Sequence, residues 1–391
     1  MLNTSFSPWP SFSEEEGDAV KRVLLSNRVN YWTGQECREF EKEFALWSGA
    51  KHAVALGNGT LALDLALRAL QVSEGDEVIV TPRTFLASVS SVVTAGATPV
   101  FADVDLNSQN IEAHTIEKCI TKKTKAVIVV HLAGMPADMD PIMELSEKHG
   151  FYVIEDCAQA HGAKYKGRSV GSIGHVGAWS FCQDKIMTTG GEGGMVTTND
   201  EELWRKMWSY KDHGKSYSAV YEKEHPPGFR WLHESFGTNW RMTEMQAAIG
   251  RIQLRRMAEW TQQRQANAKQ LESKLAEFDL VRRVKVQDFI EHAEYKHYFF
   301  IKPEMLADGW FRDRIVEEIV QRGVPCFQGS CSEVYLEKAF DDTGYRPAER
   351  LKNARELGET SVMMLVHPTL TQSEMKKACN TLAEVLSLAQ R

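Results

Sequence analysis

The sequence lacks the features that would place a protein in a membrane or in an oxidising compartment. None of its 391 residues belong to an apolar run of about eighteen or more, so no membrane span is expected. The start, MLNTSFSPWPSFSEEE, has no basic region followed by an apolar run, so we expect no secretory signal peptide. The seven cysteines are scattered and odd in number, which is typical of reduced thiols. We therefore expect a cytoplasmic protein without a membrane partner.

The sequence also has fewer basic than acidic residues. The chain has 46 lysines and arginines against 53 aspartates and glutamates, which gives a formal net charge of −7. A surface that binds nucleic acid is normally basic, so we expect no nucleic-acid partner. Cys326 and Cys331 stand apart from other cysteine or histidine pairs, and we therefore expect no metal site there.

What the sequence does have is a regular alternation of short apolar runs and helical patterns. The seven apolar runs lie in HAVALGNGT, DEVIVTP, TPVFADVD, AVIVVHLAG, YVIEDCAQA, VGAWSF and GGMVTTN. Strands that are apolar along their length, with helices between them, are typical of a mostly parallel sheet covered on both faces. The predicted fold class is therefore α/β.

The length of the chain and its helical patterns predict two domains. A serine before the acids of SFSEEEGDAVKRVLL is typical of a helix start, and we expect a helical N-terminal part to about Gly49. From about Asn239 the pattern predicts one long helix that connects into a second unit. We predict a large α/β domain over residues 1–250, then a connector helix with a smaller C-terminal α+β domain over residues 251–391.

Polar residues gather where the apolar runs end. Open α/β sheets bind ligands at the carboxyl ends of their strands. Gly57, Asn58, Gly59 and Thr60 follow the first run and open a helix, whose N-terminal amides can bind a phosphate. Five more candidates follow later runs: Phe85, Asp156, Gln159, Ser180 and Lys185.

Lys185 comes just before a glycine-rich run, TTGGEGGMV. The glycines at 190, 191, 193 and 194 predict backbone that a large group can approach closely, and they would let the lysine reach a cofactor. Pyridoxal phosphate needs a lysine for a Schiff base, an acid beside its pyridine nitrogen and donors for its phosphate. Each signal alone is weak, because GNGT is often a plain turn and a lone lysine is usually at the surface. The interpretation depends on the joint pattern.

Nearly the whole chain resembles the DegT/DnrJ/EryC1/StrS family of pyridoxal-phosphate-dependent nucleotide-sugar aminotransferases. The resemblance lies in GQECREFEKEFALWSGAKHAVALGNGTLALDLAL, GDEVIVTPRTFLAS, HLAGMPADMD, VIEDCAQAHGAKYKGRSVGSIGHVGAWSF, TTGGEGGMV and GTNWRMTEMQAAIGRIQL. It implies the fold-type-I architecture, with a large, mostly parallel seven-stranded sheet domain and a smaller C-terminal α+β domain. It also implies pyridoxal 5′-phosphate as the cofactor.

The resemblance implies a role for each candidate residue. Lys185 would hold the cofactor and carry a proton during the reaction, and Asp156 would pair with the pyridine nitrogen. The other cofactor-binding residues would contact the phosphate, the ring or its 3-hydroxyl: Gly59, Thr60, Phe85, Gln159 and Ser180. Asn239 would reach the phosphate from the neighbouring subunit of a homodimer. A cap on the long helix is a plainer role for Asn239.

The chain also departs from the family pattern. Many relatives have TKN around the lysine where this chain has DKI, so the local contacts there are open. The segment GVPCFQGSCSEVYLEKAF could shape sugar selectivity or could be a packed turn. His161, His213 and His297 are interpreted as structural rather than catalytic.

The expected activity is transfer of an amino group from glutamate to a nucleotide-linked keto-deoxy sugar, such as a 4-keto-6-deoxyhexose, for a surface glycan. Family members that act at C3 share these motifs, and the scaffold also carries amino-acid aminotransferases and dehydratases. The dehydratase branch has histidine in place of the cofactor lysine, so Lys185 favours transamination. The acidic net charge and the lack of a DNA-binding helix pair oppose a non-enzymatic regulator. GNGT does not match the G-x-G-x-x-G pattern of a Rossmann dehydrogenase.

Overall fold

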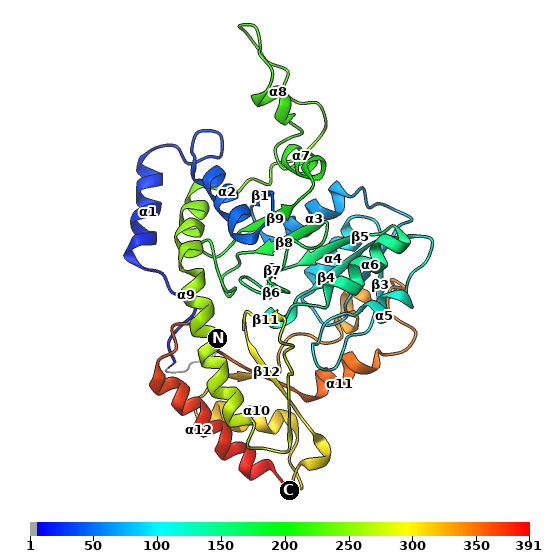
Figure 1. The fold of residues 1–391 in the computed structure, drawn as a ribbon, viewed down its shortest axis with the longest axis vertical. Helices are drawn as coiled ribbons and strands as arrows, with labels where there is room; N and C mark the ends of the chain where they lie inside the picture. The colour runs from blue at the N-terminus through cyan, green and yellow to red at the C-terminus, as the bar shows by residue number, and fades with distance from the viewer. Residues whose placement is uncertain (1–5) are drawn as a thin grey trace.

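A computed structural model describes residues 6–391 and has a seven-stranded sheet at its centre (Figure 1). The strand order is β1 (His52–Leu56), β9 (Gly194–Thr198), β8 (Val176–Ser180), β5 (Tyr152–Asp156), β4 (Thr124–Val130), β2 (Glu77–Val80) and β3 (Thr98–Phe101). β9 runs antiparallel to both of its neighbours, and every other neighbouring pair is parallel. The predicted mostly parallel seven-stranded sheet is therefore confirmed.

Helices cover both faces of this sheet because its strands are buried on both sides. Along β4, Ile128 belongs to the apolar cluster on one face and Val127 to the cluster on the other. The first face packs against α3 (Gly59–Ala69), α4 (Ala87–Thr94) and α7 (Glu201–Tyr210). The second face packs against α2 (Glu36–Ser48), α5 (Ala113–Glu117), α6 (Met139–His149) and α9 (Glu244–Leu275).

The helix starts follow local hydrogen bonding. The predicted helical N-terminal part is confirmed as α1 (Glu14–Leu25) and α2, and the backbone N–H of Ser13 donates to the Glu16 carboxylate at 2.9 Å. α9 begins at Glu244, later than predicted, because Thr243 is its N-cap and accepts from the backbone of Gln246. The proposal that Asn239 caps this helix is therefore wrong.

The C-terminal part is α+β. Its four-stranded antiparallel sheet has the order β10 (Val281–Arg283), β12 (His297–Ile301), β14 (Ser361–Met364) and β13 (Cys326–Phe327). This sheet packs with α10 (Arg312–Gln321), α12 (Gln372–Ala389) and the last turns of α9. α9 runs without a break from the large sheet to α12 (Figure 1), so the predicted boundary after residue 250 falls inside one helix and stays a prediction.

Several segments tie the two parts together. The N-terminal segment reaches α12, where the backbone N–H of Ser7 donates to the Glu374 carboxylate at 2.5 Å. A small sheet joins β11 (Ile290–Glu291) to β6 (Lys164–Tyr165) and β7 (Arg168–Ser169). After β13 the chain returns to the large sheet, where Tyr335 packs edge-on against Phe101. The GVPCFQGSCSEVYLEKAF segment thus has buried residues, such as Tyr335, and exposed ones, such as Cys331, and both of its predicted roles stay predictions. α11 (Lys352–Thr360) follows it.

Two further facts bear on the expectations from composition. Among residues 6–391, the helices are all too short or too polar to cross a bilayer. All seven cysteines are free thiols.

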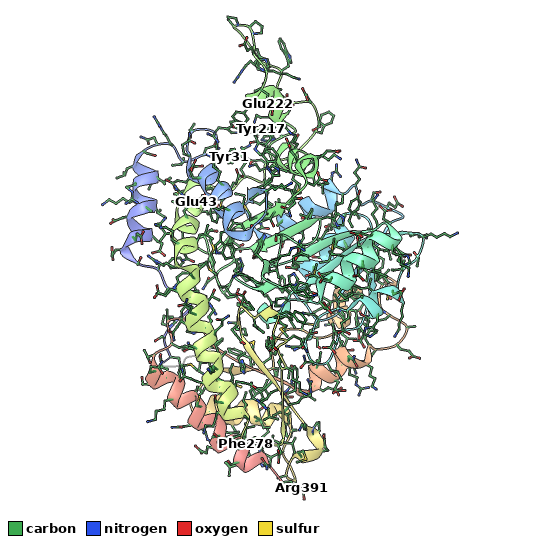
Figure 2. The ribbon with its side chains drawn as sticks, in the orientation of Figure 1. Tyr31, Glu43, Tyr217, Glu222, Phe278 and Arg391 are labelled. Atoms are coloured by element: carbon green, nitrogen blue, oxygen red, sulfur yellow. The ribbon has the colours of Figure 1, made fainter. Side chains whose placement is uncertain are left out.

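On the outer side of α2, Glu43 forms an ion pair with Arg251 of α9 at 2.7 Å, and Figure 2 shows Glu43 beside that helix.

The contact between α9 and α2 gives a testable prediction. A Cβ at Gly250 would lie 2.7 Å from Cζ of Phe40 and 2.9 Å from Cγ2 of Thr189, so Gly250→Ala would overpack this contact. We expect it to lower the free energy of unfolding by about 1–3 kcal/mol. Gly17→Ala is the matched control, because nothing lies within 4 Å of a Cβ at that position in α1. The control should raise stability by roughly 0.5–1 kcal/mol in denaturant melts. Equal effects of the two changes would contradict the close approach.

Candidate functional site

A cavity of about 550 Å³ opens at the carboxyl ends of the central strands. Its walls come from the start of α3, the turn before α4, the ends of β5 and β8, and the segment that carries Lys185. Seven of the eight candidate residues line it: Gly59, Thr60, Phe85, Asp156, Gln159, Ser180 and Lys185. The structure therefore brings together residues that are up to 126 positions apart in the sequence, from Gly59 to Lys185.

One end of the cavity is suited to an anion. Gly59 begins α3, and Asn58 caps this helix by accepting from the Leu61 amide at 3.0 Å. Amides in the first turn of a helix have no acceptor within the helix and carry its positive dipole. A Cβ at Gly59 would lie 2.5 Å from Cβ of Ser180, so glycine lets the helix start beside the Ser180 hydroxyl.

Part of the glycine-rich run after Lys185 lies against the protein's own backbone. A Cβ at Gly194 would lie 2.2 Å from the carbonyl oxygen of Asn58, so the backbone of the α3 cap occupies this space. Gly190 and Gly191 have φ of 88° and 119°, which favour glycine. Gly194 thus accommodates the protein's own turn, whereas a Cβ at Gly191 would meet nothing within 4 Å. The expectation that the run lets Lys185 reach a cofactor stays a prediction.

Asp156 is held in one orientation at the end of β5. Its Oδ2 accepts from the Ser88 hydroxyl at 2.8 Å, and Ser88 is itself 2.8 Å from the Thr84 hydroxyl. Its Oδ1 accepts from the Ala158 amide at 3.1 Å. The carboxylate is 7% exposed and lines the cavity. A fixed negative charge in this place would favour the protonated form of a pyridine nitrogen bound beside it.

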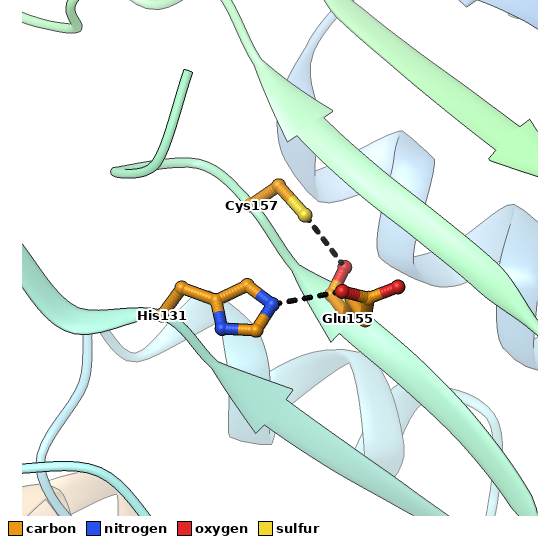
Figure 3. A group of neighbouring side chains, drawn as sticks. All are labelled: His131, Glu155 and Cys157. Carbon is orange, nitrogen blue, oxygen red and sulfur yellow. Dashed lines mark hydrogen bonds and ion pairs between the residues drawn. The ribbon is translucent and has the colours of Figure 1, made fainter. Parts of the chain in front are cut away.

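A buried hydrogen-bonded pair, His131 and Glu155, fixes the strand behind Asp156 (Figure 3). Nε2 of His131 lies 3.0 Å from Glu155 Oε2, and Nδ1 of His131 accepts from the Ala137 amide at 3.1 Å. The ring proton is therefore on Nε2. Burial alone would raise the pKa of Glu155, but bonds from His131 and from the amides of Gly171 and Gly174 lower it.

Cys157 completes this buried group, but the group does not form a metal site. The Cys157 thiol lies 3.7 Å from the carbonyl oxygen of Glu155. Both ring nitrogens of His131 and both carboxylate oxygens of Glu155 already have hydrogen-bond partners. The donor atoms that a metal would need are therefore in use, and the group orients the end of β5.

Lys185 sits beside an acid that the sequence interpretation left out. Nζ of Lys185 lies 3.8 Å from Asp184 Oδ1, and the Tyr295 hydroxyl donates to Asp184 Oδ2 at 2.5 Å. Burial would raise the pKa of Asp184, but the charge of Lys185 and the bond from Tyr295 outweigh it and lower the pKa. The carbonyl of Lys185 accepts from Nε1 of Trp9 at 2.8 Å. The DKI departure was the one signal for Asp184, and no local signal pointed to Trp9 or Tyr295.

The remaining lining residues suit a planar ring. Phe85 is 72% exposed at the cavity, so its face is open to stacking. Oε1 of Gln159 accepts from the Ala133 amide at 2.8 Å, which places this side chain across the cavity wall. An anion site, a fixed carboxylate, an open aromatic face and a lysine together fit pyridoxal phosphate, which Lys185 and Asp156 would hold at its aldehyde carbon and its ring nitrogen.

Three histidines that the sequence analysis interprets as structural do not line this cavity: His161, His213 and His297. His161 is buried between Trp179 and Phe181, and burial lowers its pKa to about 3. Burial would lower the pKa of His297, but the carboxylates of Glu272 and Glu294 outweigh it and raise the pKa to about 9. The interpretation of these histidines as structural remains a prediction.

Asn239 is the one candidate outside the cavity. It is exposed and pairs with Asp212 through an isolated backbone bridge. It lies at the base of a projecting arm, defined here as residues 217–238, that begins with α8 (Tyr217–Tyr221). Within residues 6–391, this side chain is not among those that line the cavity.

Comparisons with known proteins agree with this geometry. The model of the DegT/DnrJ/EryC1/StrS aminotransferase family matches residues 10–383. The chain is 38% identical over 383 residues to the GDP-perosamine synthase of Caulobacter vibrioides, and the match covers 96% of this chain and 97% of that protein. The X-ray structure of an aminotransferase from Psychrobacter cryohalolentis is 64% identical, has a TM-score of 0.96, and the match covers 98% of this chain and 99% of that one. The PLP-form of Spr1654 from Streptococcus pneumoniae is 26% identical with a TM-score of 0.86, and the match covers 98% of this chain and 99% of that one.

Proposed function

Because the chain belongs to the DegT/DnrJ/EryC1/StrS aminotransferase family, we propose that it uses pyridoxal phosphate to move an amino group from glutamate to a nucleotide-linked keto-deoxy sugar. The observation that carries the proposal is the single cavity that contains Lys185, Asp156 and the start of α3. We place the acceptor keto group at C4 of a 6-deoxyhexose, the carbon at which many members of the family act. The product would be an unusual amino sugar for a surface glycan. A relative named for making GDP-perosamine supports a nucleotide-linked substrate.

Each residue has a defined task in this reaction. When bound, pyridoxal phosphate supplies an aldehyde that condenses with amines and a ring that withdraws electrons. Lys185 holds the cofactor and, once released from it, moves a proton at the substrate carbon. Asp156 keeps the ring nitrogen charged, since an opposite charge raises the affinity of that nitrogen for a proton. Gly59, Thr60 and Ser180 hold the phosphate.

Product analysis tests the activity. Purified enzyme should convert dTDP-, UDP- or GDP-linked 4-keto-6-deoxy sugars to amino sugars with glutamate as the donor, and 2-oxoglutarate should form in equal amount. Amination of a 3-keto sugar alone would move the reaction to C3. Loss of water from the sugar without net transfer of nitrogen would indicate a dehydratase. Nitrogen transfer to a keto acid alone would indicate an amino-acid aminotransferase. Any of these three results would overturn the proposed 4-keto acceptor.

Two substitutions separate the roles of the lysine and the acid. Reduction with borohydride should attach the cofactor to Lys185, and peptide mapping should find no adduct in Lys185→Ala. Asp156→Ala should still retain the cofactor but should lose most turnover, because the ring nitrogen loses its paired charge. An adduct on a different lysine, or near-normal turnover of Asp156→Ala, would show that the assignment is wrong.

The proposal includes a homodimer with shared sites and a cytoplasmic location. The projecting arm exposes Phe229, Trp231 and Phe236, and exposed aromatic groups of this kind are typical of an interface. Tyr217 and Glu222 lie at its base, and the arm extends away from the body (Figures 1 and 2). In a two-fold dimer the same surface serves both subunits, and Asn239 would reach the phosphate of the partner. The free cysteines suit a reducing compartment.

Mixed dimers test the shared site. Lys185→Ala should be inactive, and Asn239→Ala should lose most activity through weaker phosphate binding. The activity of Asn239→Ala alone is measured first. Unfolding and refolding the two variants together makes about half of the dimers mixed, so about a quarter of all sites should be intact if Asn239 acts across the interface. Activity should then rise well above the average of the two parents. Activity that stays at the parental average would place Asn239 in its own subunit.

A further inference from the structure

A surplus of positive charge lies beside Lys185. The ammonium groups of Lys185 and Lys296 lie 5.5 and 4.8 Å from the centre of the Tyr295 ring. Arg264, on α9, donates from Nη1 to the Tyr295 carbonyl oxygen at 3.3 Å. The charge of Asp184 raises the pKa of Lys296, and Asp184 Oδ1 also lies 3.8 Å from Nζ of Lys185. Three cations therefore surround Tyr295, with Asp184 beside two of them.

Arg264 carries its charge in an unusual setting. It is 1% exposed, and its Nε and Nη2 have no hydrogen-bond partner in the described part of the chain. Its guanidinium lies 4.9 Å from the Trp9 ring, and Trp9 in turn donates to the carbonyl of Lys185. A cation–π contact offsets only part of the cost of burying a charge without an acid. The site therefore gains stability from an added anion.

The ionisation of the neighbouring groups agrees with this surplus. Burial lowers the pKa of Arg264 to about 9. Burial, Arg264 and Lys185 lower the pKa of Lys296 to about 8, despite the attraction of Asp184. Burial, Arg264 and Lys296 lower the pKa of His367 to about 3. Each of these groups would hold its proton more tightly with a negative charge nearby.

Lys296 can be reached from a second cavity. This cavity has a volume of about 490 Å³, and its walls come from α9, β12 and the turn at Ala133. Lys296, Tyr298 and Gln109 line it, together with the carboxylates of Glu272, Glu291 and Glu294. Ala133 lies between the two cavities, since its amide donates to Gln159 in the wall of the first. A ligand in the second cavity therefore lies next to the candidate active site.

We propose that Lys296, with Arg264 behind it, binds a carboxylate of the amino donor beside Lys185. This inference rests on the proposed function, which supplies an amino acid as one substrate. An amino acid carries its α-carboxylate one carbon from the reacting amine, so the anion must bind close to Lys185. The diphosphate of a nucleotide sugar is attached at the anomeric carbon, several bonds from a keto group at C3 or C4. An anion subsite this close to Lys185 therefore matches the amino donor better than the sugar nucleotide.

The two half-reactions test this assignment separately. Lys296→Met should weaken the apparent affinity for glutamate by about tenfold or more, on the scale of a lost hydrogen bond to a charged group. Amination of the keto sugar by enzyme already loaded with the amino group should be unchanged. Lys296→Arg should recover most of the affinity because it keeps the charge. Lys269→Met is the matched control, since Lys269 lines the same cavity on the exposed side of α9. It should leave both half-reactions unchanged.

Binding of glutarate, which has two carboxylates and no amine, gives a readout without catalysis. Glutarate should raise the melting temperature of the wild-type enzyme and of Lys269→Met, and should have little effect on Lys296→Met. If the enzyme turns over no sugar but glutarate binding still depends on Lys296, the subsite stands and the proposed function fails. If Lys296→Met affects neither glutamate nor glutarate, or weakens the keto-sugar half-reaction instead, the subsite is refuted. Arg264→Met, which removes the charge, should show the same pattern as Lys296→Met, with cofactor content and circular dichroism as checks on folding.

Discussion

Glycines at two facing positions let the first turn of α3 lie directly against the ends of β8 and β9. Side chains at Gly59 or Gly194 would collide with Ser180 or with the backbone of Asn58. This contact places the positive end of a helix beside the Ser180 hydroxyl and close to the segment that carries Lys185. The anion end of the cavity and the position of the lysine both depend on it.

Asp156 and Lys185 line the same cavity but are held in different ways. Asp156 is fixed from behind by the His131–Glu155 pair, whose hydrogen bonds are all satisfied, so the end of β5 is rigid. Lys185 lines the cavity with Asp184 beside it, whereas Lys296 and Arg264 are not among the lining residues and contact Tyr295.

α9 connects the large sheet to the C-terminal sheet. Its first half packs on the large sheet next to Phe40, and its last turns enter the core of the C-terminal sheet. Arg264 lies between these two stretches and touches Trp9 from the N-terminal segment. The electrostatics near Lys185 therefore come from three distant parts of the chain, and a change in the packing of α9 would alter them together.

The sequence by itself determined the α/β class, the seven strands and most of the cavity, because these follow from local patterns. Apolar runs predict buried strands, and parallel strands bring residues such as Asp156 and Ser180 to one edge of the sheet. The start of α9 was predicted near Asn239, although Thr243 and Gln246 form a local capping-box pattern that marks the true N-cap. Local patterns could not show that backbone from a distant turn lies against Gly194.

Only the tertiary structure decided the surroundings of the lysine. Trp9 and Lys185 are 176 residues apart, and Asp184 and Tyr295 are 111 apart, so no periodicity or spacing connects them. The same holds for Arg264, which reads in the sequence as one more charge on a long polar helix. Its burial without an acid arises only where three segments meet, because the free energy of a charge depends on what surrounds it in space and not on its neighbours in the chain.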